Sequence, residues 1–138
     1  MNTITLLIAF FFMLQMYPQE NNTTTITVVI ENLESNEGAV MASLYTEDTF
    51  LKGQGMLNSA AKIVDGQATL TFENVPEGTY GIVALHDKNS NNQMDFDAYG
   101  MPLENYGISN NKFNPYGPPV WNDAKFEVSG EPLEFKID

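Results

Sequence analysis

Residues 61–72 read AKIVDGQATLTF and hold the strongest signal for local structure in the chain. Two short runs, residues 61–64 and residues 68–72, flank the dipeptide Asp65-Gly66. Both positions of such a dipeptide tolerate a positive φ angle, which the tight two-residue turn of a β-hairpin requires. The stretch therefore predicts a hairpin and favours a β fold for the chain around it.

The same alternation of apolar and polar residues recurs on both sides of this hairpin, whereas helical periodicity is nearly absent. Five further runs place apolar residues on one face: Ile26, Val28 and Ile30; Val40, Ala42 and Leu44; Tyr80, Ile82 and Ala84; Phe126 and Val128; Leu133, Phe135 and Ile137. Seven short strands at this spacing suit two packed sheets. We therefore predict an all-β fold, a two-sheet antiparallel sandwich of about seven strands, as a single domain over residues 20–138.

The N-terminal residues read MNTITLLIAFFFMLQMY and contain an apolar run from Leu6 to Leu14. A run of this length is typical of a signal peptide and is too short to span a bilayer comfortably. We therefore predict a signal peptide at residues 1–19, a secreted or periplasmic protein, and no stable membrane span after signal removal. The alternative is an uncleaved anchor, because no Lys or Arg precedes the run and no clear small-x-small cleavage site precedes Pro18.

The chain is strongly acidic, with 18 Asp and Glu residues against 6 basic residues and a net charge of −12. This charge repels phosphate backbones, so nucleic acid is excluded as a partner. No cysteine is present, so the fold has no disulfides and depends on packing and on any bound ion. The simpler explanation of this acidity is solubility in a salty exterior. The more specific explanation is that some of the carboxylates bind cations.

Oxygen-bearing side chains alternate along residues 86–97, which read HDKNSNNQMDFD. Calcium binds about six to eight hard oxygen ligands, which alternate positions of a curled loop can direct at one centre. Asn92 stands where EF-hand loops place a bend-forming Gly, and Asn is able to adopt the left-handed conformation. We therefore predict calcium as the cofactor, bound by Asp87, Asn89, Asn91, the main-chain carbonyl of Gln93, Asp95 and Asp97.

The loop differs from an EF-hand, but its charges still favour a bound cation. An EF-hand itself is not supported, because its twelfth position would be Ala98 instead of Glu and neither flank has a helical pattern. The three carboxylates of Asp87, Asp95 and Asp97 would repel one another in a closed loop, and a divalent cation removes that repulsion. The alternative is an Asx-rich turn that only caps strand ends.

The interval 87–122 has little strand-like alternation, yet it contains Tyr99, Tyr106, Phe113, Tyr116 and Trp121. Exposed rings beside polar groups would form a sugar- or peptide-binding face. Alternatively, the rings fold back over an open end or edge of the sandwich, and the latter interpretation is favoured because a long loop must bury something to stay ordered. The candidate ligand-binding residues are Tyr99, Glu104, Tyr106, Asn110, Tyr116 and Trp121.

Three segments together resemble a known bacterial family. They are FENVPEGTY at residues 72–80, which runs into IVALHD at residues 82–87, then GMPLENYGISNN at residues 100–111, and GPP at residues 117–119. The chain resembles the secreted family called domain of unknown function 2141 over nearly all of residues 26–137. The resemblance implies a transthyretin-like or immunoglobulin-like β-sandwich that is exported and has no assigned biochemical role.

Nothing in the sequence indicates a catalytic site. His86 is the only histidine, and no Ser or Cys with a partner accompanies it. We therefore expect an exported non-catalytic domain with a calcium-binding loop, a binding or structural module of the envelope or exterior whose partner is a protein or a glycan. The alternative is an enzyme or carbohydrate-binding module acting on an extracellular polymer through Glu104, His86 or the loop acids.

Overall fold

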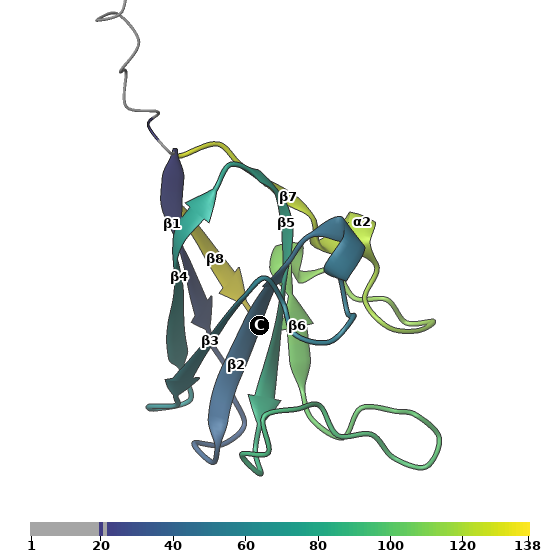
Figure 1. The fold of residues 1–138 in the computed structure, drawn as a ribbon. Helices are drawn as coiled ribbons and strands as arrows, with labels where there is room; N and C mark the ends of the chain where they lie inside the picture. Colours follow the sequence, from purple (N-terminus) through teal and green to yellow (C-terminus); the bar gives the residue numbers. More distant parts are fainter. Residues whose placement is uncertain (1–19, 21) are drawn as a thin grey trace, which may run out of the picture.

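The computed structural model describes residue 20 and residues 22–138, so the predicted signal peptide lies outside the described residues. Eight strands form two sheets that face each other (Figure 1). The strands are β1 (Thr23–Ile30), β2 (Ala39–Tyr45), β3 (Leu57–Lys62), β4 (Ala68–Pro76), β5 (Gly78–Asp87), β6 (Tyr106–Ile108), β7 (Phe126–Val128) and β8 (Leu133–Ile137). The predicted all-β sandwich is confirmed.

One sheet has the strand order β4-β1-β8, and the other has the order β3-β2-β5-β6, with β7 also paired to β5. All strand pairs are antiparallel except β1 and β8, which run parallel with residues 26–30 opposite residues 133–137. These two strands are far apart in the chain, so no tight turn forces them to be antiparallel. The one strand that the sequence pattern missed is β6, whose three residues are too few to show alternation.

The Asp65-Gly66 turn forms as predicted. Val64 and Gln67 exchange two main-chain hydrogen bonds of 2.9 and 3.1 Å across it, and Asp65 and Gly66 have φ angles of 53° and 74°. Pairing stops beyond this turn, because β3 continues along β2 while β4 continues along β1. The hairpin is therefore the point at which the chain crosses from one sheet to the other.

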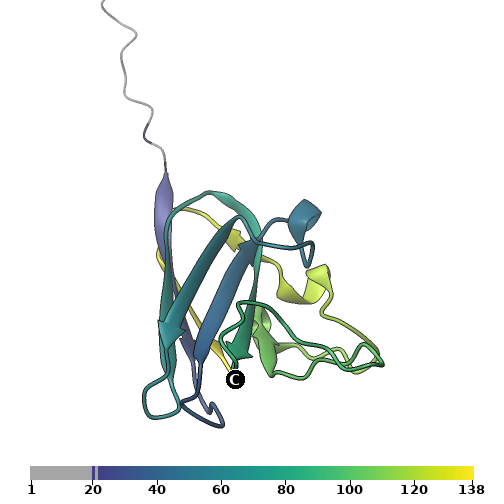
Figure 2. The same cartoon turned by 60° about the horizontal axis from the view of Figure 1, so that its bottom comes forward.

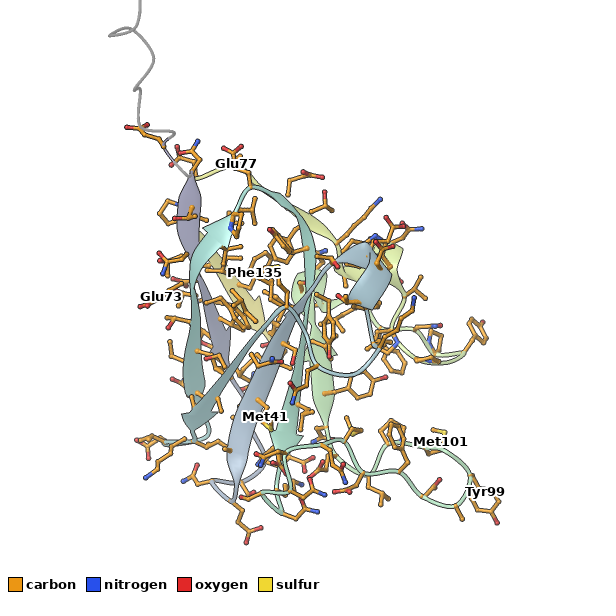
Figure 3. All side chains as sticks on the ribbon, viewed as in Figure 1. Met41, Glu73, Glu77, Tyr99, Met101 and Phe135 are labelled. Atoms are coloured by element: carbon orange, nitrogen blue, oxygen red, sulfur yellow. The ribbon has the colours of Figure 1, made fainter. Side chains whose placement is uncertain are left out.

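Side chains from both sheets form one hydrophobic core. The predicted alternation holds in β1, where Ile26 and Val28 are fully buried and Ile30 is 6% exposed. Figure 3 places Phe135 of β8 between the sheets, where its ring centroid lies 4.4 Å from that of Phe126. The core thus joins both sheets and leaves the connections between the strands to carry other functions.

Three short helical segments lie in these connections. They are η1 (Glu47–Thr49), η2 (Ser109–Asn111) and α2 (Trp121–Ala124). In the part of the chain that the structure describes, no helix has both the length and the apolar character needed to cross a membrane. Figure 2 shows that the long excursions around residues 100 and 116 both project beyond the sheets on the same side, as they also do in Figure 1.

Candidate functional site

The predicted metal loop begins at the last residue of β5, Asp87, which is only 1% exposed. Its Oδ1 accepts a hydrogen bond from the N–H of Asn91 at 3.2 Å, and its Oδ2 accepts one from the N–H of Asn92 at 2.9 Å. Ser90 and Asn92 have left-handed φ angles of 57° and 63°. The chain therefore curls around the Asp87 carboxylate, and Asn92 makes the bend that the sequence assigned to it.

Two asparagine side chains join Asp87 to Asp95 across this curl. The Nδ2 atoms of Asn89 and Asn91 donate to the Asp95 carboxylate at 2.7 to 3.0 Å. The Oδ1 of Asn89 accepts the N–H of Asn91, and the Oδ1 of Asn91 accepts the N–H of Gln93, each at 3.2 Å. The side chains of Asn89, Asn91 and Asp95 are thus linked directly, and Asp87 joins them through the main-chain N–H of Asn91. The role of the Gln93 carbonyl stays a prediction.

Asp97, the sixth predicted ligand, makes its hydrogen bonds elsewhere. Its Oδ1 accepts the N–H groups of Tyr99 and Met101 at 2.8 and 2.9 Å. An Asp readily caps its own turn in this way, and the contacts are local in sequence. Asp97 thus supports a second turn beside the loop, and its role as a ligand stays a prediction.

The chain between Asp95 and Leu103 forms a small hairpin that rises from the metal loop. Its base is the hydrogen bond from the Leu103 N–H to the Asp95 carbonyl at 2.8 Å, followed by the bridge between Phe96 and Pro102. Tyr99 lies at the tip and points away from the sandwich (Figure 3). Asp95 therefore belongs to both structures, through its carboxylate to the metal loop and through its carbonyl to the hairpin.

Basic side chains do not neutralise this loop. Lys88 forms an ion pair with Glu34 at 3.2 Å, and the only other pair within residues 20 and 22–138 joins Lys112 to Asp123. The hydrogen bond from Lys88, followed by one from Asn105, holds the pKa of Glu34 below its usual range. The carboxylates of Asp87 and Asp95 thus have no ammonium partner in the described chain.

The atoms of this loop that could coordinate a cation are all oxygens. Within the described residues, no three side chains of the His, Cys, Asp and Glu types form a group that could hold a metal ion. A cation here would depend on two carboxylates together with amide and main-chain oxygens. An amide or carboxylate oxygen that accepts one N–H keeps a second lone pair for a cation. Such a hard oxygen set fits calcium and does not fit zinc.

Glu104 and His86, the residues of the enzyme alternative, are buried. Glu104 is 7% exposed, and its Oε1 accepts the main-chain N–H of Lys88 at 2.9 Å. His86 is 2% exposed, and its Nε2 lies 2.8 Å from the carbonyl oxygen of Glu37. Glu104 Oε2 and His86 Nδ1 are buried atoms without a hydrogen-bond partner in the described chain. A polymer at the surface would not reach either side chain.

The polar triplet Ser109-Asn110-Asn111 ties several elements together. Ser109 Oγ accepts the N–H of Ile82 at 3.1 Å and donates to the carbonyl of Ala124. Asn110 has a φ of 70°, and its Nδ2 donates to two carbonyls of the α2 region at 3.0 and 3.1 Å. Asn111 Nδ2 donates to the carbonyl of Lys136 in β8 at 2.8 Å. Asn110, a predicted ligand-binding residue, thus has its amide nitrogen occupied by the fold itself.

The aromatic residues of the long interval divide into two groups. Tyr99, Phe113 and Tyr116 are 91%, 78% and 96% exposed, so the interpretation that they cover the sandwich is wrong. Trp121 does pack inward, with its ring centroid 5.5 Å from that of Phe50, and Tyr106 is half-buried in β6. The loops hold their exposed rings in place through main-chain and Asx hydrogen bonds instead of burial.

The geometry agrees with the family comparison. A family model described as "Uncharacterized protein conserved in bacteria (DUF2141)" matches residues 28–136. The chain belongs to this family. No curated protein and no solved structure gives a significant match. In this DUF2141 chain the matched span runs from β1 to β8, so it includes the metal loop, the hairpin and the Ser109-Asn110-Asn111 triplet.

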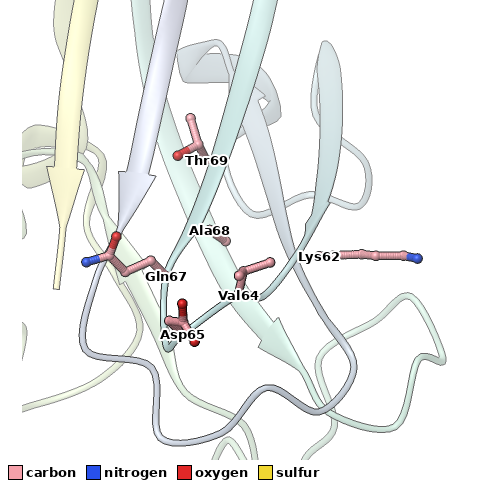
Figure 4. A pocket seen from close by; sticks show the side chains of 6 residues that line it. All are labelled: Lys62, Val64, Asp65, Gln67, Ala68 and Thr69. Carbon is pink, nitrogen blue, oxygen red and sulfur yellow. The ribbon is translucent and has the colours of Figure 1, made fainter.

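A surface hollow of the DUF2141 domain lies at the Asp65-Gly66 turn (Figure 4). Its lining side chains are Lys62, Val64, Asp65, Gln67, Ala68 and Thr69. They include one carboxylate, Asp65, and one amine, Lys62, and no ion pair joins these two within the described residues. The hollow therefore shows no paired acid and base, and the candidate site remains the loop after β5.

Proposed function

We propose that this bacterial protein is an exported, non-catalytic binding module in which calcium fixes the loop after β5. The ion would bind among Asp87, Asn89, Asn91 and Asp95, with main-chain oxygen from Gln93. It would hold the base of the hairpin that carries Tyr99. The role is thus to present a surface, and the partner would be a protein or a glycan outside the cytoplasm.

The observation that carries this proposal is the hydrogen-bonded curl around the left-handed bend at Asn92, in which Asn89 and Asn91 bond to Asp95 while Asp87 accepts main-chain N–H groups of the same loop. Within the described residues, neither Asp87 nor Asp95 forms an ion pair with a lysine, because Lys88 pairs with Glu34, so the two carboxylates are not paired with a positive charge. A divalent cation relieves such repulsion, and calcium tolerates the irregular oxygen sets of flexible loops better than magnesium does.

Export is supported by the apolar run Leu6 to Leu14 and by the acidic composition. Calcium is abundant outside cells, where sites of modest affinity, with dissociation constants of about 10⁻⁴ to 10⁻³ M, are sufficient. A loop with two carboxylates and two amides belongs in this affinity range, since ligand charge sets the strength of binding. The proposed location is therefore the periplasm or the exterior.

The binding surface is supported by the exposed rings of Tyr99 and Tyr116, which lie on two excursions that project on the same side of the molecule (Figures 1 and 2). Exposed aromatic faces stack on sugars or on apolar side chains. The enzyme alternative has less support, because its acid, Glu104, and its base, His86, are both buried.

Thermal and urea unfolding with calcium or with chelator tests the proposal. At calcium about a hundred times its dissociation constant, the free energy of unfolding should rise by about 2.7 kcal/mol. Asp95→Asn should abolish this gain, and so should Asp87→Ala, although Asp87→Ala also removes two buried hydrogen bonds and lowers stability without calcium. Asp48→Asn, an exposed acid in η1, is the charge-matched control and should keep the full gain.

The difference between the unfolding free energies in calcium and in chelator tests whether the protein binds calcium. Identical unfolding of the wild-type protein in calcium and in chelator would contradict the proposal. If calcium stabilises the Asp95→Asn variant as much as the wild type, the ion does not bind in this loop. Magnesium at the same concentration should give a smaller gain, because a small octahedral ion fits a loop of many protein oxygens poorly.

A further inference from the structure

The segment that leads into β6 places Glu104 opposite Asp87. β5 and β6 pair with Leu85 opposite Tyr106, and the His86 N–H continues the ladder by donating to the Asn105 carbonyl at 2.9 Å. The next opposite positions in this register are Asp87 and Glu104. Side chains at opposite positions of an antiparallel pair share one face, with Cβ atoms about 4.5–5.5 Å apart.

Both acids of this pair are buried, which is costly for like charges. Asp87 is 1% exposed and Glu104 is 7% exposed, and neither belongs to an ion pair in the described chain. The Asp87 oxygens each accept a main-chain N–H, and Glu104 Oε1 accepts the N–H of Lys88, next to Asp87. Glu104 Oε2 accepts nothing within the described residues. A buried oxygen without a donor is rare and calls for a ligand or a proton.

We propose that Glu104 is a calcium ligand that completes the site begun by Asp87, Asn89, Asn91 and Asp95. This inference rests on the proposed calcium loop and adds a ligand from the far end of the excursion. One ion would then tie residue 87 to residue 104 and close the base of the segment that carries Tyr99. EF-hand loops supply a glutamate ligand at their twelfth position. Here Glu104, just before β6, would supply that ligand.

The proposal requires a small adjustment of side chains. The carboxylates of Asp87, Asp95 and Glu104 do not form a group close enough to hold a metal in the described structure. Without a cation, the three carboxylates repel one another, and a divalent cation between them would remove that repulsion and let them approach. Rotation of the Glu104 side chain about its own bonds changes the position of the carboxylate without moving the strand.

Calcium titration calorimetry on the full chain and its variants tests this inference, with far-ultraviolet circular dichroism to verify folding. Glu104→Gln keeps the size of the side chain and an acceptor for the Lys88 N–H, but removes the charge. It should weaken calcium binding at least about tenfold, the lower limit for partners that only orient a metal ligand. Glu73→Gln, an exposed acid of β4 (Figure 3), is the matched control and should bind as the wild type does.

Thermal melts supply a second readout, because Glu104→Gln should change the melting temperature in opposite directions in chelator and in calcium. In chelator, Glu104→Gln should melt at or above the wild-type temperature, because it removes the repulsion with Asp87. In calcium, the order should reverse, because the variant loses the gain from the ion. A residue with a purely structural role would shift both melts in one direction.

The outcomes separate the two proposals. If Glu104→Gln binds calcium as tightly as the wild type while Asp95→Asn does not bind, Glu104 is not a ligand and the calcium loop stands. Equal melting of Glu104→Gln and wild type in both buffers, with unchanged affinity, would show that the Glu104 carboxylate neither binds the ion nor repels Asp87, and would overturn the inference. If the wild-type protein itself binds no calcium, both proposals are wrong.

Discussion

Replacing Ser109 by alanine should destabilise the protein far more than the loss of one hydroxyl at the surface. Ser109, Ile82 and Ala124 are each 0% exposed, so water cannot replace the lost contacts. The substitution leaves the N–H of Ile82 and the carbonyl of Ala124 unsatisfied. Each buried unsatisfied group costs about 1–3 kcal/mol. We therefore expect a loss of about 2–6 kcal/mol, a large share of the 5–15 kcal/mol that is typical of small domains.

Urea unfolding followed by circular dichroism measures this loss. With an m-value of about 2 kcal/mol per molar urea, the midpoint should fall by about 1–3 M. Ser129→Ala, at an exposed position outside the strands, is the matched control and should stay within about 0.5 kcal/mol of the wild type. A loss below about 1 kcal/mol for Ser109→Ala at an unchanged m-value would refute the reasoning, because it would mean that both main-chain groups find other partners.

Two further predictions concern aromatic residues. The double variant Tyr99→Ala and Tyr116→Ala should change the free energy of unfolding by no more than about 0.5 kcal/mol, because both rings are more than 90% exposed. A loss above about 1 kcal/mol in urea unfolding would show that the rings pack in solution. Burial raises the pKa of the Tyr80 phenol, whose O–H donates to the Pro76 carbonyl. Above about pH 10 the unfolded chain ionises first, so stability should fall as the pH rises through the folded pKa, and Tyr80→Phe should lose less stability between about pH 9 and pH 11.

Period-2 alternation predicted the sandwich because each strand has one face in the core. Ile26, Val28 and Ile30 are buried as the pattern required, and the Asp65-Gly66 turn has the predicted positive φ angles. The pattern could not predict which strands pair. β3 and β4 flank a tight turn yet belong to different sheets, because the choice of partner depends on packing across the core and not on the turn.

The candidate loop was predictable in part, since ligand spacing is a local property. The spacing predicted that Asp87, Asn89, Asn91 and Asp95 come together in one curled loop, and hydrogen bonds do connect them, whereas their role as ligands stays a prediction. The short hairpin after Asp95 was not visible in the sequence, and it places the Asp97 carboxylate against the N–H of Met101. The position of Glu104 depends on the pairing of β6 with β5, and the three residues of β6 give no pattern from which that register could be read.

The excursion between β5 and β6 raises an energetic question, because it stays ordered without a core of its own. Fixing the backbone costs about 1–2 kcal/mol per residue, and Tyr99 and its neighbours bury little surface to offset that cost. Order comes instead from carboxylates that accept main-chain N–H groups, from Asp87 at the start, Asp97 at the tip and Glu104 at the return. Charge-assisted bonds of this kind contribute about 1.5–3 kcal/mol each, yet they gather negative charge in one place. A cation at the base would strengthen the order and remove the repulsion together, which is the physical reason for the calcium site that we propose here.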